Sequence, residues 1–210
     1  MHSNKKPIKH SGIQTLYENR FLNFYHMDAL TDTGRTFDYY FVSRNKPESI
    51  KAVTGIHKAE GIVIYPILKS DPTKIIMIKQ WRYPLNDYLY ELPAGLIDGE
   101  ESASEAAIRE MKEETGLTFL PYEGGNSSFR NPFYMGAGYT DEASSAVFGY
   151  VEELDGSQAL EDTETIQVLV CDKEEVRRIL REEKVSLRAG YLLMQFLSSD
   201  PLHPFQFLEG

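Results

Sequence analysis

The stretch GLIDGEESASEAAIREMKEETGL, residues 95–117, carries the strongest local signals for structure and chemistry in this chain. Ser102 and Glu105 have the S-x-x-E spacing of a capping box, in which each side chain bonds to the backbone N–H of the other residue. This spacing predicts a helix that begins near Ala103. Gly116 is well placed to end that helix, because glycine tolerates the left-handed conformation that commonly follows the last turn.

Three carboxylates lie close together in this predicted helix. Glu110, Glu113 and Glu114 are three and four positions apart, and at roughly 100° per residue such spacings share one face. A run of glutamates on a helix is usually a solvated acidic face. Three carboxylates on one short arc nevertheless repel one another unless a cation lies between them, and carboxylate oxygen suits Mg²⁺ or Mn²⁺. The surrounding residues decide between these interpretations.

The spacing of the fixed residues favours a metal site. Gly95 is followed after five residues by Glu101, and after seven more by the run REMKEETGL, residues 109–117. This pattern resembles, without departure at any specified position, the box of the Nudix hydrolases, G-x5-E-x7-R-E-U-x-E-E-x-G-U, in which U is a bulky aliphatic residue. Members of that family bind divalent metal through this loop–helix–loop and hydrolyse a nucleoside diphosphate linked to another group. The resemblance implies the same for this chain.

Composition bounds the kind of protein. With 210 residues, 41% of them hydrophobic, the chain is long enough for one sizeable domain, or for one domain with a small appendage. The single cysteine, Cys171, excludes an intrachain disulfide. No apolar run is long enough to span a bilayer, and the N-terminal MHSNKKPIKH lacks the apolar stretch of a signal peptide. A net charge of −10 argues against a general nucleic-acid surface. We therefore expect a cytoplasmic protein that binds neither nucleic acid nor membrane.

Residues 1–50 are expected to form a separate N-terminal region of β-strands. Residues 13–30 and 35–44 are rich in aromatic side chains, and Asp32-Thr33-Gly34 between them predicts the turn of a hairpin. The polar segment 45–58 reads as a connector. We place the boundary near residue 50, with the second domain over residues 51–210.

The rest of the chain alternates apolar strands with amphipathic helices. Strands are predicted at 61–68, 74–80, 88–92, 144–152 and 165–171, further helices at 173–182 and 187–198, and a loop-rich segment at 124–139. This order favours an α/β fold in which a mixed sheet lies between helices. The resemblance sharpens this to the Nudix α/β/α sandwich over about residues 58–200.

Sequence on both sides of the box resembles one branch of the family. QWRYPLNDYLYELPAGLIDGEE, residues 80–101, contains Q-x-R-x-P and E-x-P-A-G, which recur in ADP-ribose pyrophosphatases, and Pro132 lies fifteen residues after Leu117, about where that branch has a proline. Arg82 is expected to bind the diphosphate, because a guanidinium offers phosphate two parallel hydrogen bonds. The alternative is a surface arginine that covers Trp81. Glu91 is expected to help close the site.

The loop MGAGYTDE, residues 135–142, resembles the S-P-G-[FY]-[ST]-D-E loop of the same branch, with Gly136-Ala137 where Ser-Pro is usual. That departure predicts a more mobile loop. Glu142 is retained, and the resemblance implies that it closes on the metals or on the attacking water. A solvated loop acid is the alternative.

The resemblance assigns roles to the metal-binding residues. Glu110 and Glu114 are the main metal carboxylates, Glu113 is a further ligand or orients water, and the carbonyl of Ala94 is a ligand. Clustered Mg²⁺ ions, with Mn²⁺ as a substitute, would make water nucleophilic and neutralise the phosphoryl oxygens. The candidates for direct participation in catalysis are Glu113, Glu114 and Glu142.

Four further box residues are expected to be structural. Glu101 and Arg109 would brace the loop through an ion pair rather than contact substrate. Gly95 and Gly116 stand where a side chain would obstruct a tight turn.

The N-terminal strands have an expected role in substrate binding. Aligning the turn at 32–34 with the family's hairpin places Phe21 and Tyr39 where related enzymes stack on adenine, and the branch implies a homodimer with swapped N-terminal hairpins. The alternative is that these aromatic residues only pack a half-buried strand.

The sequence thus predicts Mg²⁺-dependent hydrolysis of ADP-ribose to AMP and ribose 5-phosphate. Another nucleoside diphosphate sugar, such as GDP-mannose, is the alternative substrate. A ligand-binding regulator that lost catalysis is a third hypothesis, against which the intact box argues.

Overall fold

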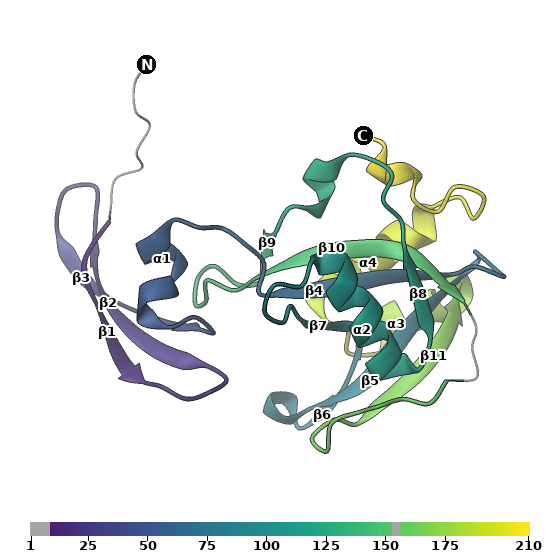
Figure 1. The fold of residues 1–210 in the computed structure, drawn as a ribbon, viewed down its shortest axis with the longest axis horizontal. Helices are drawn as coiled ribbons and strands as arrows, with labels where there is room; N and C mark the ends of the chain where they lie inside the picture. The colour runs from purple at the N-terminus through teal and green to yellow at the C-terminus, as the bar shows by residue number, and fades with distance from the viewer. Residues whose placement is uncertain (1–8, 153–155) are drawn as a thin grey trace. The chain divides into compact units, whose positions relative to one another are not determined.

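Two units make up the chain in the computed structural model, which describes residues 9–152 and 156–210. The N-terminal unit comprises the described residues up to Glu60 together with Phe133–Ala143. The second unit comprises Gly61–Pro132 and the described part of Ser144–Gly210. Figure 1 shows the elements of both units, which we describe in turn.

The N-terminal unit is built on a three-stranded antiparallel sheet. Its strands are β1 (His10–Tyr17), β2 (Asn23–Leu30) and β3 (Thr36–Ser43), in the order β1-β2-β3. The predicted turn between β2 and β3 is present, with Gly34 at a φ of 79°. One face of the sheet is buried in a cluster formed by Tyr25, Phe41 and Ile50.

The prediction of a single hairpin over residues 13–44 is incomplete. Residues 13–30, predicted as one run before the turn, belong to two strands, β1 and β2. The side-chain oxygen of Asn19 accepts hydrogen bonds from the N–H groups of Phe21 and Leu22, at 2.7 and 2.9 Å. Such a bond from an asparagine to the backbone two residues on closes a turn. This turn separates β1 from β2.

Short elements complete the N-terminal unit. The predicted connector contains a 3-10 turn, η1 (Pro47–Ser49), and a one-turn helix, α1 (Lys51–Thr54). Within the loop-rich segment lie a 3-10 helix, η3 (Ser127–Arg130), which belongs to the second unit, and the two-residue strand β9 (Phe133–Tyr134).

The second unit contains a mixed sheet. Its central path is β11-β5-β4-β10-β8, with β6 paired to β5 and β7 paired to β4. The pairing of β4 with β10 is parallel, whereas β11 with β5 and β10 with β8 are antiparallel. The bounds are β4 (Gly61–Leu68), β5 (Lys74–Arg82), β6 (Asp87–Glu91), β7 (Ala94–Leu96), β8 (Thr118–Pro121), β10 (Ala143–Glu152) and β11 (Ile166–Asp172).

Helices cover both faces of this sheet. They are α2 (Ala103–Thr115), α3 (Lys173–Glu182) and α4 (Leu187–Ser198), with the 3-10 helices η2 (Tyr83–Leu85) and η4 (Gln206–Leu208). Figure 1 shows α2 on one side of the sheet and α3 and α4 on the other. Within the described residues, no helix is long and apolar enough to cross a membrane.

Strand β4 faces both helical layers, because successive side chains of a strand point to opposite faces. Its even-numbered residues Ile62 and Ile64 share a core with three residues of α2, namely Ala106, Ala107 and Met111. Its odd-numbered residues share the other core with α3 and α4, namely Val63, Tyr65, Ile67, Val176, Ile179, Leu193 and Phe196. The predicted α/β/α sandwich is thus confirmed.

Candidate functional site

The box helix has the predicted caps. The hydroxyl of Ser102 accepts a hydrogen bond from the N–H of Glu105, and the carboxylate of Glu105 accepts one from the N–H of Ser102 at 2.8 Å. At the other end, Gly116 has a φ of 74° and donates its N–H to the carbonyl of Lys112. These caps fix the helix ends, and the helix ends in turn set the direction of the glutamates on its last turns.

Two of these glutamates lie against strand β7. One carboxylate oxygen of the buried Glu114 accepts a hydrogen bond from the N–H of Ala94 at 3.1 Å. The carboxyl group of Glu110 lies so close to Gly95 that a Cβ there would be 1.9 Å from its carboxyl carbon. Since atoms cannot approach so closely, the space that Gly95 leaves is what Glu110 occupies. The helix and the strand therefore share a cradle that holds two carboxyl groups.

Burial makes the charged form of both carboxyl groups costly. Burial raises the pKa of Glu110, and it raises the pKa of Glu114 well above the ordinary value, the latter against an opposing hydrogen bond from Ala94. Glu110 further raises the pKa of Glu114 through its charge. A bound divalent cation would offset both effects, and carboxylate and carbonyl oxygens are its preferred ligands. The donor set fits Mg²⁺ or Mn²⁺.

Glu113 is more exposed and pairs with an arginine. Arg109 binds both carboxylate oxygens of Glu101, at 3.0 Å each, and donates to the carbonyl of Leu96 at 2.9 Å. Its Nη1 also donates to Glu110 at 2.8 Å and to Glu113 at 3.1 Å. Arg109 thus ties the loop before the helix to the acidic face of the helix.

The structure also pairs Arg82, at the end of β5, with Glu91, at the end of β6. Arg82 Nε donates to Glu91 Oε2 at 2.5 Å, and the carboxylate side is buried while the arginine is partly exposed. The charge of Arg82 lowers the pKa of Glu114, against the dominant effect of burial. Glu91 therefore holds Arg82 at a position from which the positive charge of Arg82 acts on Glu114 in the carboxylate cradle.

A further carboxylate, Glu164, was not singled out by the sequence. Its charge is one of the causes that raise the pKa values of both Glu110 and Glu114. Ile166 pairs with Gln80, and the N–H of Trp81 donates to the carbonyl of Thr165. Continued by one residue, this antiparallel register sets Glu164 opposite Arg82. Glu164 stands in an acidic loop without a motif, and only the pairing of β11 with β5 reveals it.

The other three predicted site residues belong to the N-terminal unit. Glu142 pairs with Arg44, whose Nε lies 3.2 Å from its Oε2. Phe21 is exposed in the turn between β1 and β2, with the guanidinium of Arg20 4.4 Å from its ring centroid. Tyr39 lies in β3 and donates its hydroxyl to the carbonyl of Gly138 at 2.7 Å. The structure thus brings the box glutamates together with residues of β5, β6 and β7 in the second unit. Glu142, Phe21 and Tyr39 lie in the N-terminal unit.

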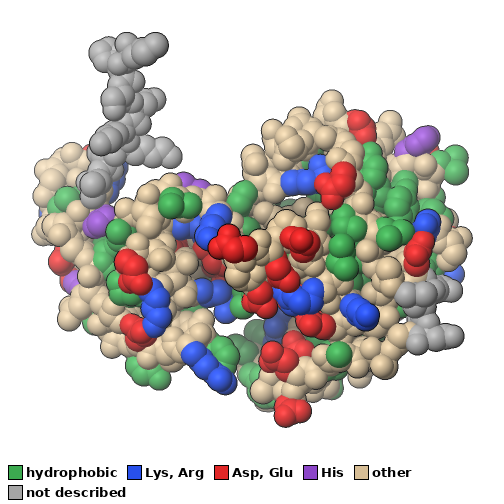
Figure 2. Space-filling model, viewed as in Figure 1, with side chains coloured by type: hydrophobic (Ala, Val, Ile, Leu, Met, Phe, Trp, Pro, Cys, Tyr) green, Lys and Arg blue, Asp and Glu red, His purple; other side chains and the backbone are tan. Residues whose placement is uncertain are grey.

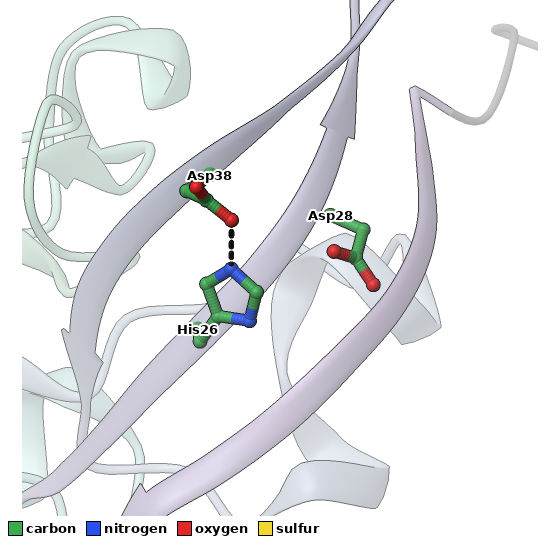
Figure 3. Close-up of side chains that lie close together, drawn as sticks. All are labelled: His26, Asp28 and Asp38. Atoms are coloured by element: carbon green, nitrogen blue, oxygen red, sulfur yellow. Dashed lines mark hydrogen bonds and ion pairs between the residues drawn. The ribbon is translucent and has the colours of Figure 1, made fainter.

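Another group of possible ligands lies on the three-stranded sheet. His26 and Asp28 on β2 and Asp38 on β3 place one ligand atom each within 4.8 Å of one another, the one such group among the described residues (Figure 3). His26 Nε2 is 2.8 Å from a carboxylate oxygen of Asp38. Both aspartates are exposed to solvent, where a hydrated carboxylate needs no cation, so this group carries no metal assignment.

The charges around α2 are mixed in sign. On the face of the second unit that carries α2, acidic and basic side chains are interspersed (Figure 2). Among the described residues that this view shows, the basic side chains do not form a continuous stripe.

Comparison with known proteins shows the family to which this chain belongs. The family model described as NUDIX domain matches residues 57–193. The chain is 30% identical over 169 residues to "Putative nudix hydrolase 2" of Caenorhabditis elegans, covering 76% of this chain and 70% of that protein. It is 27% identical over 154 residues to "ADP-ribose pyrophosphatase" of Bacillus subtilis (strain 168), covering 73% of this chain and 80% of that protein.

A solved structure shares the fold. The structure titled "Crystal structure of ADP compounds hydrolase" superimposes with a TM-score of 0.67 at 20% sequence identity, covering 92% of this chain and 97% of that chain. The box, its caps, the carboxylate cradle and the family match lead to one conclusion: the chain belongs to the Nudix hydrolases.

Proposed function

We propose that this Nudix enzyme hydrolyses ADP-ribose to AMP and ribose 5-phosphate in the presence of Mg²⁺ or Mn²⁺. The observation that carries the proposal is the cradle in which the partly buried Glu110 and the buried Glu114 lie against β7, with the charge of Arg82 nearby. The name of the Bacillus subtilis relative supports the choice of ADP-ribose.

In this proposal the metal ligands are Glu110, Glu114 and the carbonyl of Ala94, with Glu113 as a further ligand or as the group that orients water. The bound cation supplies Lewis acidity and lowers the pKa of water. The hydrogen bond from the backbone N–H of Ala94 to Glu114 keeps this residue beside the carboxylate. Arg109 holds the acidic face in place while it is held by Glu101.

The remaining residues bind the substrate, orient the attacking water or accept the proton of that water. Water forms a bond to one phosphorus of the diphosphate, the bond from that phosphorus to the bridging oxygen breaks, and the bridging oxygen leaves with the other phosphate. Arg82 would bind the diphosphate oxygens, with Glu91 fixing its guanidinium. Glu113, Glu114 and Glu142 are the carboxylates proposed to orient the water or accept its proton.

We also propose that the active unit is a homodimer in which the N-terminal sheets complete the neighbouring site. Phe21 or Tyr39 would then stack on adenine. The proposal is supported by aromatic side chains that one face of the sheet leaves exposed, namely Tyr17, Phe24 and Tyr40, of which Tyr17 pairs with Phe24 and Phe24 stacks with Tyr40. A contiguous apolar surface of this kind is typical of an interface.

A panel of nucleoside diphosphate substrates tests the activity. The purified protein is incubated with ADP-ribose, GDP-mannose and other nucleotide sugars, with Mg²⁺ or with EDTA, and the phosphate products are quantified. We expect ADP-ribose to have the highest kcat/KM, and EDTA to abolish turnover. Preference for GDP-mannose would assign the alternative substrate. Tight binding of ADP-ribose without any hydrolysis would identify a regulator instead.

A further inference from the structure

One buried ion pair in the N-terminal unit joins helix α1 to the segment before β4. Lys51 Nζ donates to both carboxylate oxygens of Glu60, at 2.5 and 2.6 Å. The lysine side chain is only 6% exposed and the glutamate 12%. Lysine is almost never this buried without a specific partner, so the position of this charge needs an explanation.

The two members of the pair hold the two peptide groups that flank Glu142. Lys51 Nζ also donates to the backbone carbonyl of Asp141 at 2.8 Å. Glu60 Oε2 accepts the backbone N–H of Ala143 at 2.9 Å. One charge therefore fixes the chain immediately before Glu142, and the opposite charge fixes it immediately after.

Further bonds reinforce the same attachment. The backbone N–H of Lys51 donates to Asp141 Oδ2 at 3.1 Å. The side-chain amide of Asn45, just beyond β3, donates to Glu60 Oε1 at 3.0 Å. The acceptor atoms of Glu60 are thus shared between Lys51, Asn45 and the loop, which makes the carboxylate the centre of a network.

The loop before this point is also attached to strand β3. It contains Gly136 and Gly138, and glycine gives a backbone more conformations than any other residue. Strand β3 supplies two bonds: the N–H of Val42 donates to the carbonyl of Tyr139 at 2.8 Å, and the hydroxyl of Tyr39 to the carbonyl of Gly138 at 2.7 Å. The ion pair is the corresponding attachment at the end that carries Glu142.

A buried ion pair of this kind is a poor source of stability. The cost of removing both charges from water offsets much of their attraction, whereas hydrogen bonds to fixed peptide groups define geometry. We propose that Lys51 and Glu60 are positioning residues that hold Glu142 in the orientation required for hydrolysis. This inference rests on the proposed function, in which Glu142 takes part in the reaction.

A double-mutant cycle with Glu142 tests the inference. The variants are Lys51→Met, Glu142→Gln and the combination, and the readout is kcat and KM for ADP-ribose with Mg²⁺. If Lys51 acts through Glu142, Lys51→Met lowers kcat about tenfold to a hundredfold with little change in KM, and has almost no further effect once Glu142 is Gln. A loss of the same size in both backgrounds would overturn the inference, because it would show a general structural role.

The control is Lys69→Met. Lys69 also forms an ion pair with a glutamate, Glu152, at 2.5 Å, but both side chains are exposed. Removing this pair is expected to leave kcat unchanged, since exposed pairs contribute little. A fall in kcat equal to that of Lys51→Met would count against a specific role for the buried pair.

Backbone hydrogen exchange separates this inference from the proposed function. The N–H of Ala143 should exchange faster in Glu60→Gln than in the wild-type protein, because the substitution weakens its hydrogen-bond acceptor. It should exchange fastest in Lys51→Met/Glu60→Gln, which removes both charges without leaving one buried alone. Unchanged exchange in both variants would refute the inference. If the wild-type protein hydrolyses none of the nucleotide sugars, the proposed function fails, and exchange at Ala143 alone decides whether the pair holds the loop. If Lys51→Met does not fold, the cycle is made with Glu60→Gln.

Discussion

The carboxyl group of Glu110 occupies the space that a side chain at Gly95 would need. A Cβ on Gly95 would lie 1.9 Å from the carboxyl carbon and 2.0 Å from Oε1 of Glu110. The glycine has no positive φ, so its conformation alone does not require glycine. What requires glycine is the direct approach of the Glu110 carboxyl group to the backbone of β7.

Gly95→Ala is therefore expected to displace Glu110 and lower kcat about a hundredfold. A matched control is Gly190→Ala in α4, where an added Cβ would meet nothing within 4 Å. That change is expected to keep full activity and to raise stability by roughly 0.5–1 kcal/mol, because alanine favours a helix. Steady-state kinetics and thermal unfolding of both variants check this. Wild-type kcat in Gly95→Ala would show that the position of Glu110 is unimportant.

Glu114→Gln is expected to lower kcat about a hundredfold or more while the protein stays folded. The amide keeps the shape of the side chain but lacks the charge that a divalent cation needs. Its oxygen can still accept the N–H of Ala94, so the cradle is preserved. Activity is measured over a Mg²⁺ titration with circular dichroism as the check on folding. Near-normal turnover at saturating Mg²⁺ would contradict the assignment of Glu114 as a ligand.

The raised pKa of Glu114 predicts how the free energy of unfolding of the metal-free protein depends on pH. Burial raises the pKa of Glu114 in the folded protein above the ordinary value of 4.5. The folded state then binds more protons than the unfolded chain between those two values, so the free energy of unfolding falls as the pH rises from about 4.5 through the raised pKa. Groups with lowered pKa values, such as Glu101, act in the opposite direction and below their ordinary value of 4.5.

Thermal unfolding in EDTA tests this dependence. The wild-type Tm is expected to fall from about pH 5 to about pH 8, and Glu114→Gln, which cannot ionise, should show a weaker fall. Addition of Mg²⁺ at about pH 8 should raise the wild-type Tm more than that of the variant, since a ligand stabilises the state that binds it. Parallel curves for the two proteins would show that Glu114 does not contribute.

The sequence is sufficient to predict where the box helix begins and ends, because the residues that determine its ends are local. Ser102, Glu105 and Gly116 act on backbone groups within a few residues of themselves, and the helix begins and ends where those residues predict. Short apolar periods likewise predict five strands of the second unit to within two residues at each end, and α3 and α4 match the predicted ranges. The short strands β7 and β8 were not predicted.

Other features depend on pairs that are distant in sequence. Lys51 looks like an ordinary surface lysine until Glu60 and Asp141 are placed around it. Glu164 has no motif, and only the register of β11 on β5 leads it toward Arg82. The split of the first predicted strand was missed because it depends on the side chain of Asn19 bonding to two backbone N–H groups.

Arg82→Ala is expected to lower kcat/KM for every nucleoside diphosphate substrate by a similar factor, about tenfold to a hundredfold. A hydrogen bond to a charged group contributes about 1.5–3 kcal/mol, and the diphosphate is common to all the substrates. Arg178→Ala is the control, because Arg178 also pairs with glutamates but lies on α3. A loss confined to one base would mean that Arg82 recognises the nucleoside.

The proposed dimer predicts that polar substitutions on the exposed face of the N-terminal sheet produce a monomer. Phe24 and Tyr40 stack with ring centroids 6.0 Å apart, and Tyr17 pairs with Phe24 across β1 and β2. In a two-fold dimer each copy would bury the same face. Deleting the strands would be a less specific test, since β3 also holds the loop that carries Glu142.

Phe24→Ser/Tyr40→Ser is therefore expected to elute as a monomer and to have a KM for ADP-ribose about tenfold higher, because a stacking contact contributes roughly 1–3 kcal/mol. Leu202→Ser, which changes a side chain that is 82% exposed in the second unit, should leave both the dimer and the KM unchanged. Light scattering coupled to gel filtration gives the mass, and kinetics on the same fractions give the KM. A wild-type protein that is monomeric and fully active at assay concentrations would disprove the dimer, and a dimeric double variant would place the interface elsewhere.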